Sequence, residues 1–204
     1  MDVKVRDEII KTEYLIIGGG VAGLQSAITA GSKGVDVLVA EKADTRRSGN
    51  GCGGNDHFMC YLPECHGDDF ARVISEISEG MEGGPWQDPA MLRKMMRRTE
   101  SVVQRWEEWG INMKPTGKYN FEGHTMPSRQ CYHLKYDGAN QKRVLTNKAR
   151  ENGAKIMNKL YINDILTNEE GRAVGAIGFI LADDEPEVVV IQCKAVLVAT
   201  AQAM

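Results

Sequence analysis

A run of glycines directly behind a short apolar segment constrains the fold of this chain more than any other feature. Gly18, Gly20 and Gly23 form the pattern G-x-G-x-x-G at the end of Glu13–Gly18, whose side chains are typical of a buried strand. In this pattern the first glycine allows a sharp turn, the second lets backbone amides approach a pyrophosphate, and the third lets the next helix pack on the sheet. The N-terminus of that helix offers free N–H groups and a partial positive charge to the phosphates. The pattern predicts a dinucleotide-binding loop.

The residues after the glycines complete a strand–helix–strand unit. Val21–Ala30 has helical spacing, and Asp36–Ala40 is a second buried strand, which together give the ~30 residues expected of such a unit. Glu41 lies 18 residues beyond Gly23, where a carboxylate accepts the ribose hydroxyls, and Lys42 beside it is a further candidate for cofactor binding. The carboxylate disfavours a 2′-phosphate and hence NADP. A glycine turn without a ligand is the alternative, and the pattern alone does not separate NAD from FAD.

The composition limits the class of protein. With 25 Lys+Arg against 28 Asp+Glu in 204 residues, the formal charge of −3 argues against generic binding to nucleic acid or to an anionic membrane. The apolar stretches are far shorter than the ~20 residues of a spanning helix, and no apolar signal segment opens the chain. Five cysteines at irregular spacing do not form a secreted disulfide framework. We therefore expect a cytoplasmic protein that acts on a small molecule, without nucleic acid or direct membrane insertion.

The rest of the chain predicts a mixed α/β architecture. Segment 44–67 is polar and without period, which is typical of a functional or disordered loop. A loop and possible ribbon covers 111–133, and antiparallel strands with turn residues between them form a late β-meander. The predicted helices are 68–81, 88–109 and 140–152, and the predicted later strands are 154–157, 160–166, 173–182, 187–192 and 194–200.

Three segments of the sequence carry a family resemblance. They are YLIIGGGVAGLQSAITA…VDVLVAEK, the stretch RRSGNGCGGN at 46–55, and AVGAIGFILADDEPEVVVIQCKAVLVAT near the end. Together they resemble the FAD-binding domain of the flavoprotein subunits of fumarate reductase and succinate dehydrogenase, with a Rossmann-like parallel sheet, helices and an antiparallel β-meander. The details GAIGF at 175–179 and EEWG at 107–110 lean toward the alpha subunit of adenylylsulfate reductase.

The resemblance implies a cofactor, a reaction and a partner. The cofactor is FAD, the reaction is hydride or electron-pair transfer at the flavin, and the partner is an iron–sulfur subunit that exchanges electrons with it. In this family the second loop passes beside the flavin ring, and the last strand returns to the cofactor. The residues implied to bind FAD are Gly18, Gly20, Gly23, Glu41, Lys42, Ser48, Gly49, Gly53, Gly54, Asn55, Ile162 and Thr200.

Asn55 and His57 are the candidate catalytic residues, because the resemblance brings them near the flavin ring and the substrate. An amide can hydrogen-bond flavin or substrate, and an imidazole can transfer a proton near neutral pH. The alternative is that both residues cap a turn.

Three departures from the family pattern lead to further expectations. Covalent members carry a flavin-linking His directly after the Arg-Ser pair, where this chain has Gly49, so we expect non-covalent FAD. The usual Ala-Thr-Gly-Gly reads Ala199-Thr200-Ala201-Gln202 here, which puts a Gln202 side chain where backbone would approach the cofactor. Family members are several hundred residues long, so we expect 1–204 to be an FAD-binding domain, the N-terminal portion of a larger flavoprotein. Its expected parts are 1–43 (dinucleotide unit), 44–67 (flavin-contacting loop), 68–153 (helical insert) and 154–204 (strands and meander).

The cysteines and histidines outside these motifs suggest no metal site. Cys52, Cys60, Cys65 and His66 have the spacing C-x7-C-x4-C-H, which fits no compact zinc or iron–sulfur pattern, so ordinary thiols are favoured. His124 and His133, near Arg129 and Lys135, could bind a substrate anion, but exposed loop positions are the simpler interpretation.

In the predicted helix 88–109, the spacing of the apolar and basic residues predicts one apolar face with a solvated basic flank, rather than an element that binds nucleic acid. The residues expected on the apolar face are Met91, Leu92, Met95, Val102 and Trp106, and those on the flank are Arg93, Lys94, Arg97 and Arg98.

Two other functions remain open on the sequence. One is an NAD-dependent dehydrogenase, and the other is a truncated or non-catalytic nucleotide-binding module. A yellow protein that releases FAD on denaturation would separate the flavoprotein from the first alternative, and reduction of an acceptor would separate it from the second.

Overall fold

The computed structural model describes residues 4–79, 88–123, 130–180 and 186–201, and its chain divides into two compact units. The first, here called the sheet unit, consists of Met1–Gly53 and Gln141–Met204. The second, here called the helical unit, is Gly54–Asn140.

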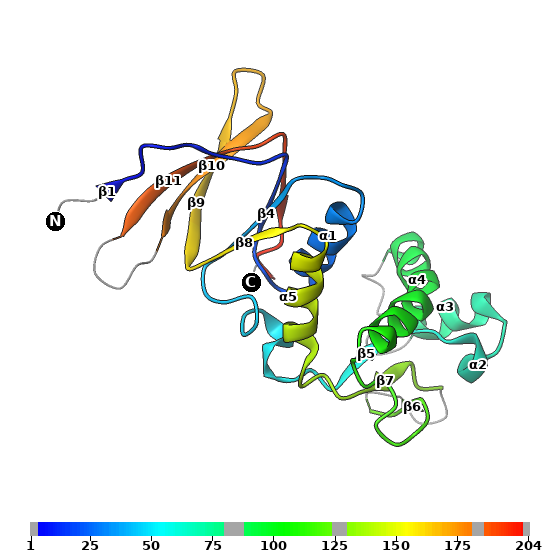
Figure 1. Cartoon of the computed structure of the whole chain (residues 1–204). Helices are drawn as coiled ribbons and strands as arrows, with labels where there is room; N and C mark the ends of the chain where they lie inside the picture. The colour runs from blue at the N-terminus through cyan, green and yellow to red at the C-terminus, as the bar shows by residue number, and fades with distance from the viewer. Residues whose placement is uncertain (1–3, 80–87, 124–129, 181–185, 202–204) are drawn as a thin grey trace. The chain divides into compact units, whose positions relative to one another are not determined.

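A four-stranded parallel sheet forms the centre of the sheet unit (Figure 1). Its strands are β3 (Tyr14–Ile17), β4 (Val37–Glu41), β8 (Lys155–Asn158) and β12 (Ala195–Val198), in the order β12-β3-β4-β8. Helix α1 (Val21–Gly31) packs on β3 and β4 and against α5 (Gln141–Glu151). The β4 side chains are buried throughout, as the apolar run predicts for a strand covered on both faces. The predicted strand–helix–strand unit is confirmed.

An antiparallel meander forms the second sheet of this unit. It consists of β9 (Leu160–Thr167), β10 (Ala173–Ile180) and β11 (Glu187–Gln192), as the sequence predicts. Two short strands, β1 (Lys4–Val5) and β2 (Ile10–Lys11), pair in parallel with β11. These two strands give no sequence signal, because two residues are too few to show a period of two. Side chains of both sheets share one core, which includes Leu15, Leu38, Ala176 and Ile191.

The helical unit combines two longer helices with a small sheet. Helices α3 (Phe70–Glu79) and α4 (Pro89–Glu108) pack together, and β5 (His57–Met59), β7 (His133–Lys135) and β6 (Asn120–Phe121) form an antiparallel sheet. The expectation of an aperiodic segment 44–67 was wrong in part. It contains the 3-10 turn η1 (Asn50–Gly53), β5, and the single-turn helix α2 (Pro63–His66), which are each too short to give a periodic signal.

Helix α4 begins as predicted, and Leu92 and Trp106 of the predicted apolar face are buried, but the rest of the buried face differs from the prediction. The Asp88 side chain accepts a hydrogen bond from the Ala90 amide at 2.8 Å, and Pro89 occupies the first turn. Met91 and Met95 were expected in the core, yet they are 63% and 47% exposed, whereas Met96 is fully buried. The buried positions are Leu92, Met96, Thr99, Val103 and Trp106.

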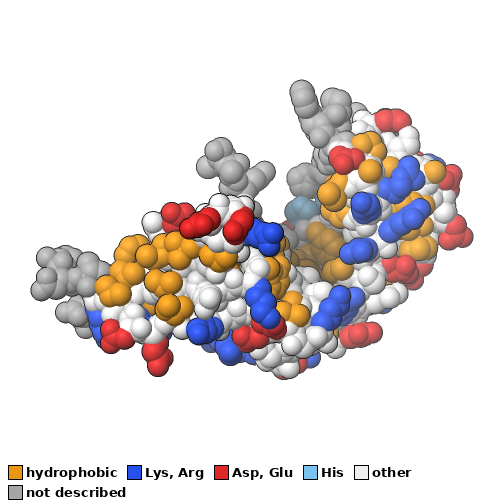
Figure 2. Space-filling view, turned by 90° about the horizontal axis from the view of Figure 1, so that it is seen from above, with side chains coloured by type: hydrophobic (Ala, Val, Ile, Leu, Met, Phe, Trp, Pro, Cys, Tyr) orange, Lys and Arg blue, Asp and Glu red, His pale blue; other side chains and the backbone are white. Residues whose placement is uncertain are grey.

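The physical reason is that these positions follow alternating steps of three and four residues, which keep one face toward α3 and the small sheet. Met91 and Met95 lie one position before this face and stand among basic residues. The surface of the helical unit accordingly mixes basic and hydrophobic side chains (Figure 2).

Among the helices of the described residues, none combines the length and the hydrophobicity that a membrane span requires.

Truncation of Met96 tests which face of α4 is buried. We expect Met96→Ala to lower the free energy of unfolding by about 2–5 kcal/mol, because the removed atoms leave a cavity in the core. Met91→Ala is the matched control, and its effect should stay within about 0.5 kcal/mol, since Met91 is exposed. Urea unfolding followed by circular dichroism measures both, and equal losses would contradict the assignment.

Candidate functional site

The glycine loop leaves the carboxyl end of β3, where parallel sheets of this type bind ligands. Gly18 has φ +104°, and a side chain there would also collide with the Ala199 carbonyl oxygen, 2.4 Å from the added Cβ. At Gly23 an added Cβ would lie 2.0 Å from the Gly18 carbonyl oxygen. Both glycines are therefore required for the first turn of α1 to pack on β3 and β12, which agrees with the turn and packing roles expected from the pattern.

The two glycine-rich loops meet within the sheet unit. Gly49 has φ +77°, and an added Cβ there would lie 3.0 Å from the Cα of Gly20. At Gly20 itself, an added Cβ would find only the Cα of Gly49, 4.0 Å away. Gly20 thus borders open space, whereas Gly18 and Gly23 are enclosed by backbone. A side chain at Gly20 would fill the space that the pattern reserves for a pyrophosphate.

Glu41 is buried and holds the glycine loop. Its Oε2 accepts a hydrogen bond from the Gly19 amide at 2.7 Å, and its Oε1 accepts one from the Ala43 amide at 2.8 Å. The side chain is 4% exposed, while Lys42 next to it is exposed. Each carboxylate oxygen can accept a second hydrogen bond. The sequence predicts Glu41 as a ribose ligand and does not reveal that it also positions Gly19.

Lys142, which no sequence motif marks, is a buried residue that contacts the glycine loop. It lies in the first turn of α5, is 3% exposed, and donates a hydrogen bond from Nζ to the Gly19 carbonyl oxygen. Burial lowers its pKa to about 8, against the opposing effect of nearby Glu41, Cys52 and Asp44. It stands more than 120 residues from the loop it contacts, in a stretch without a recognisable motif, so only the tertiary structure reveals it.

Two hydroxyl groups of the second loop are buried without a hydrogen-bond partner among the described residues. They are Thr45 Oγ1 and Ser48 Oγ. A buried hydroxyl that lacks a partner costs free energy, and such groups in native proteins are commonly completed by water or by a ligand. Open space at Gly20 and a hydroxyl at Ser48 therefore fit a polar ligand held between these loops.

The remaining predicted cofactor residues of the sheet unit lie on different segments. Ile162 is half-buried on β9, and just before this strand the Lys159 amide donates to the Ala43 carbonyl oxygen at 2.9 Å. Thr200 is exposed, with its Cα next to Gly18. Gly53 is exposed at the end of η1.

The departure from the family pattern after Thr200 has a structural counterpart. Ala201 adopts φ +75°, a left-handed conformation that favours glycine and that a non-glycine residue adopts at a cost of about 1–2 kcal/mol. Gln202, expected to place its side chain near the cofactor, lies outside the described residues.

Asn55 and His57 belong to the helical unit, as does Gly54. His57 Nδ1 lies 2.6 Å from Asp56 Oδ1, and Lys135 Nζ donates to Asp56 Oδ2 at 2.8 Å. The hydrogen bonds from Lys135 and His57 lower the pKa of Asp56 to about 2, so this carboxylate stays charged at neutral pH. Asn55 is exposed, and its side chain hydrogen-bonds Tyr136.

His133 was expected in an exposed loop, and this expectation was wrong. It is half-buried on β7, and its ring lies 5.8 Å from that of His57. The pairing of β7 with β5, which brings the two rings together, joins segments more than 70 residues apart and gives no local signal. His124 and Arg129 lie outside the described residues.

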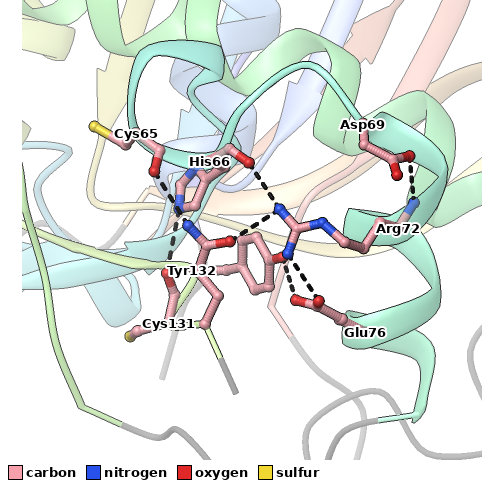
Figure 3. A network of polar contacts seen from close by, with 8 residues as sticks. Cys65, His66, Asp69, Arg72, Glu76, Cys131 and Tyr132 are labelled. Atoms are coloured by element: carbon pink, nitrogen blue, oxygen red, sulfur yellow. Dashed lines mark hydrogen bonds and ion pairs between the residues drawn. The ribbon is translucent and has the colours of Figure 1, made fainter. Parts of the chain in front are cut away.

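His66 is a structural residue of the helical unit. Its Nδ1 accepts from the Leu62 amide at 3.0 Å and its Nε2 donates to the Cys131 carbonyl oxygen at 3.2 Å, so backbone groups engage both ring nitrogens. Burial lowers its pKa. In the surrounding network, Arg72 donates to the His66 carbonyl oxygen and to Glu76, and Tyr132 also donates to Glu76 (Figure 3).

The three cysteines between residues 52 and 65 differ in exposure. Cys60 is buried, which raises the pKa of its thiol, whereas Cys52 and Cys65 are exposed. Within the described ranges, no group of three or more His, Cys, Asp or Glu side chains is placed to hold a metal ion.

A separate hollow lies at the opposite edge of the parallel sheet. Its lining includes Tyr14 and Ala195, where β3 and β12 begin, and Val35, just before β4. Ligands of such sheets bind at the carboxyl ends of the strands. This hollow is therefore a poor candidate for the dinucleotide site.

The comparison with protein families decides between the possible dinucleotides. The family model for the FAD binding domain matches residues 13–204. The chain belongs to this family. Its cofactor is FAD. The open space at Gly20 fits that cofactor, as do the hydroxyls of Thr45 and Ser48, which find no hydrogen-bond partner in the described part of the chain.

Solved structures of FAD-dependent oxidoreductases have the same fold. Adenosine-5-phosphosulfate reductase in complex with sulfite, as a covalent adduct, matches with a TM-score of 0.78 and 25% identity over 99% of this chain and 32% of that chain. Adenylylsulfate reductase from Archaeoglobus fulgidus matches with a TM-score of 0.78 and 26% identity, over 100% of this chain and 32% of that chain. Quinol fumarate reductase from E. coli matches with a TM-score of 0.76 and 17% identity, over 96% of this chain and 33% of that chain. At this low identity the match shows the fold alone.

This chain spans about a third of the length of these proteins. The comparison with curated protein sequences gives no match.

Two glycine variants separate the packing role of the loop from its binding role. We expect Gly20→Ala to fold normally yet bind FAD at least about tenfold more weakly, because its methyl group enters the open space beside Gly49. Gly23→Ala should lower the free energy of unfolding by about 2 kcal/mol or more, because its Cβ would overlap the Gly18 carbonyl. Thermal unfolding and FAD titration measure the two effects. Unchanged FAD affinity in Gly20→Ala would contradict the assignment.

Proposed function

We propose that this chain is the FAD-binding part of an oxidoreductase that transfers a hydride or an electron pair between a small-molecule substrate and the flavin, and that exchanges electrons between the flavin and an iron–sulfur subunit. The observation that carries the proposal is the meeting of two glycine loops at the carboxyl edge of the sheet, in a chain matched by the FAD binding domain family. When bound, FAD supplies the redox chemistry, since its ring accepts and returns two electrons with a proton. The five irregularly spaced cysteines, which form no disulfide in the described structure, support a cytoplasmic location.

The residues proposed to hold FAD each have a physical role. Backbone amides of the glycine loop and the N-terminus of α1 bind the pyrophosphate. Glu41 accepts hydrogen bonds from the ribose hydroxyls with its remaining lone pairs. Ser48 and Gly49 contact the linker to the flavin, and Lys42 neutralises charge at the edge of the site. The other proposed contacts are Gly53, Gly54 and Asn55 with the flavin ring, Ile162 with the adenine, and Thr200 at the end of β12.

Glu41 can be tested without emptying its place in the core. Glu41→Gln keeps one acceptor for the Gly19 amide but loses the charge and one acceptor oxygen. FAD affinity should fall about tenfold in a titration at pH 7, since hydrogen bonds to charged groups contribute about 1.5–3 kcal/mol. Unchanged affinity would remove Glu41 from the cofactor site.

Non-covalent attachment of FAD follows from Gly49. The family position that carries a linking His in covalent members is a glycine here, in a backbone conformation that side chains rarely adopt. We expect the purified protein to be yellow, and acid precipitation should leave the FAD in the supernatant. Flavin that stays with the pellet would contradict this, and a colourless protein with NAD affinity would favour a dehydrogenase instead.

His57 and Asn55 are the proposed groups for proton transfer and for hydrogen bonding at the reacting centre. The contact with Asp56 holds the imidazole in one orientation, and Lys135 holds Asp56 in turn. Adenylylsulfate is the first acceptor to test, because the two adenylylsulfate-type reductases share at least 25% identity with this chain, and fumarate is the second.

The test for His57 compares reduction rates at equal FAD content. With reduced methyl viologen as donor, His57→Gln should lower the rate about 100-fold or more, which is the size of a general acid–base contribution. His66→Gln alters the structural histidine and serves as a fold control, whose loss of activity should follow its loss of stability. A protein that binds FAD and reduces neither acceptor would favour a non-catalytic module.

A further inference from the structure

Lys142 is a buried cation that the family assignment does not explain. Its side chain is 3% exposed, and its ammonium group donates to the carbonyl oxygen of Gly19, between two glycines of the binding pattern. Lys148 on the same helix instead pairs with Glu151 near the surface, with Nζ and Oε2 2.7 Å apart. A lysine is rarely buried to this degree unless it is paired, because removal of the ammonium from water is costly.

The surroundings of Lys142 compensate its charge only in part. Among the described residues it forms no ion pair, and its hydrogen bond goes to an uncharged carbonyl group. Glu41, Asp44 and the exposed thiol of Cys52 are the titratable groups close enough to affect it. Glu41 also accepts hydrogen bonds from the Gly19 and Ala43 amides, and Asp44 forms an ion pair with Arg46. Burial outweighs these anions, so the pKa of Lys142 falls to about 8.

The hydrogen bond also determines where an adjacent amide points. The Gly19 carbonyl and the Gly20 N–H belong to one peptide group, and the described chain has no cis peptide bond. In a trans peptide these two groups point in opposite directions. While Lys142 binds the carbonyl, the Gly20 N–H is directed away from Lys142. Gly20 is the N-cap of α1 and the glycine of the loop that borders open space.

The packing of α5 brings Lys142 to both cofactor loops. An added Cβ at Gly51 in η1 would lie 3.0 Å from the side-chain nitrogen of Gln141 and 4.0 Å from Cδ of Lys142. The aliphatic part of the Lys142 side chain therefore lies beside the second loop, and its ammonium group binds the first loop.

We propose that Lys142 is a positioning residue for FAD: its buried ammonium orients the Gly19 peptide and supplies positive charge that the diphosphate of FAD compensates. This rests on the proposed function, since it requires FAD at the glycine loop. A diphosphate nearby favours the charged form of Lys142, so FAD binding raises the pKa of this lysine and takes up protons near pH 8. Affinity is then highest below the pKa of the free protein and falls as the pH rises through it.

The experiment is a titration of FAD into apoprotein at pH 7, 8 and 9, followed by the quenching of flavin fluorescence. Unmutated protein should bind about tenfold more weakly at pH 9 than at pH 7, since a single proton is linked to binding. Lys142→Met has nearly the same shape without charge, and it should bind at least about tenfold more weakly at pH 7 and show no such decline. Lys148→Met, on the same helix, should behave as the unmutated protein does.

Several outcomes would overturn the proposal. Affinity in Lys142→Met equal to that of the unmutated protein would contradict the positioning role. A decline of affinity with pH that persists in Lys142→Met would show that another group causes it. If Lys142→Met fails to fold, calorimetry of FAD binding to the unmutated protein at pH 8.5 in two buffers of different ionisation enthalpy decides, and zero proton uptake rejects the proposal. A failure of unmutated protein to bind FAD at any pH would instead reject the proposed function itself.

Discussion

The glycine loop after β3 depends on a single residue, Gly19, that is held from two sides. The amide of Gly19 donates to the buried carboxylate of Glu41, and its carbonyl accepts from the buried ammonium of Lys142. Neither charge is exposed to water, so each depends on the loop backbone for part of its solvation. An added Cβ at Gly19 would lie 2.5 Å from the Thr45 methyl group and 3.0 Å from Glu41 Oε2, so no side chain fits between them. These contacts tie the end of β4 and the start of α5 to the loop after β3.

This arrangement explains how distant parts of the chain build one edge of the sheet. The helical unit separates Gly53 from Gln141 in the sequence, and the chain then returns as α5 and β8 beside α1 and β4. Ala199, at the end of β12, closes against Gly18. Backbone packing and two buried charged side chains therefore hold the glycine loop in place at the carboxyl edge of the parallel sheet. Loops on rigid strands are a common way to keep a ligand site in one shape.

The parts of the fold that the sequence predicts are those with long or chemically specific signals. The strand–helix–strand unit follows from an apolar run, three spaced glycines and a second apolar run, and the meander follows from alternating strands with NEEGR and DDEP between them. Helix α4 follows from Asp88, Pro89 and Gly110 at its ends. Its buried face was misjudged because Met91 and Met96 are equally apolar, and only packing decides which of them is covered.

The family and the glycine loop could be predicted from the sequence, because glycine is strongly favoured where one backbone segment approaches another, as at Gly18 and Gly23, and this need appears directly as residue type and spacing. The spacing also singled out Glu41 at the end of the second strand, and in the structure its carboxylate accepts a hydrogen bond from the Gly19 amide. Three contacts appear only in the tertiary structure. Lys142 donates a hydrogen bond to the Gly19 carbonyl, and Gly49 approaches Gly20. The ring of His133 lies beside that of His57. Each of these contacts joins segments far apart in the chain, and the packing that brings them together is a property of the whole core rather than of any local pattern.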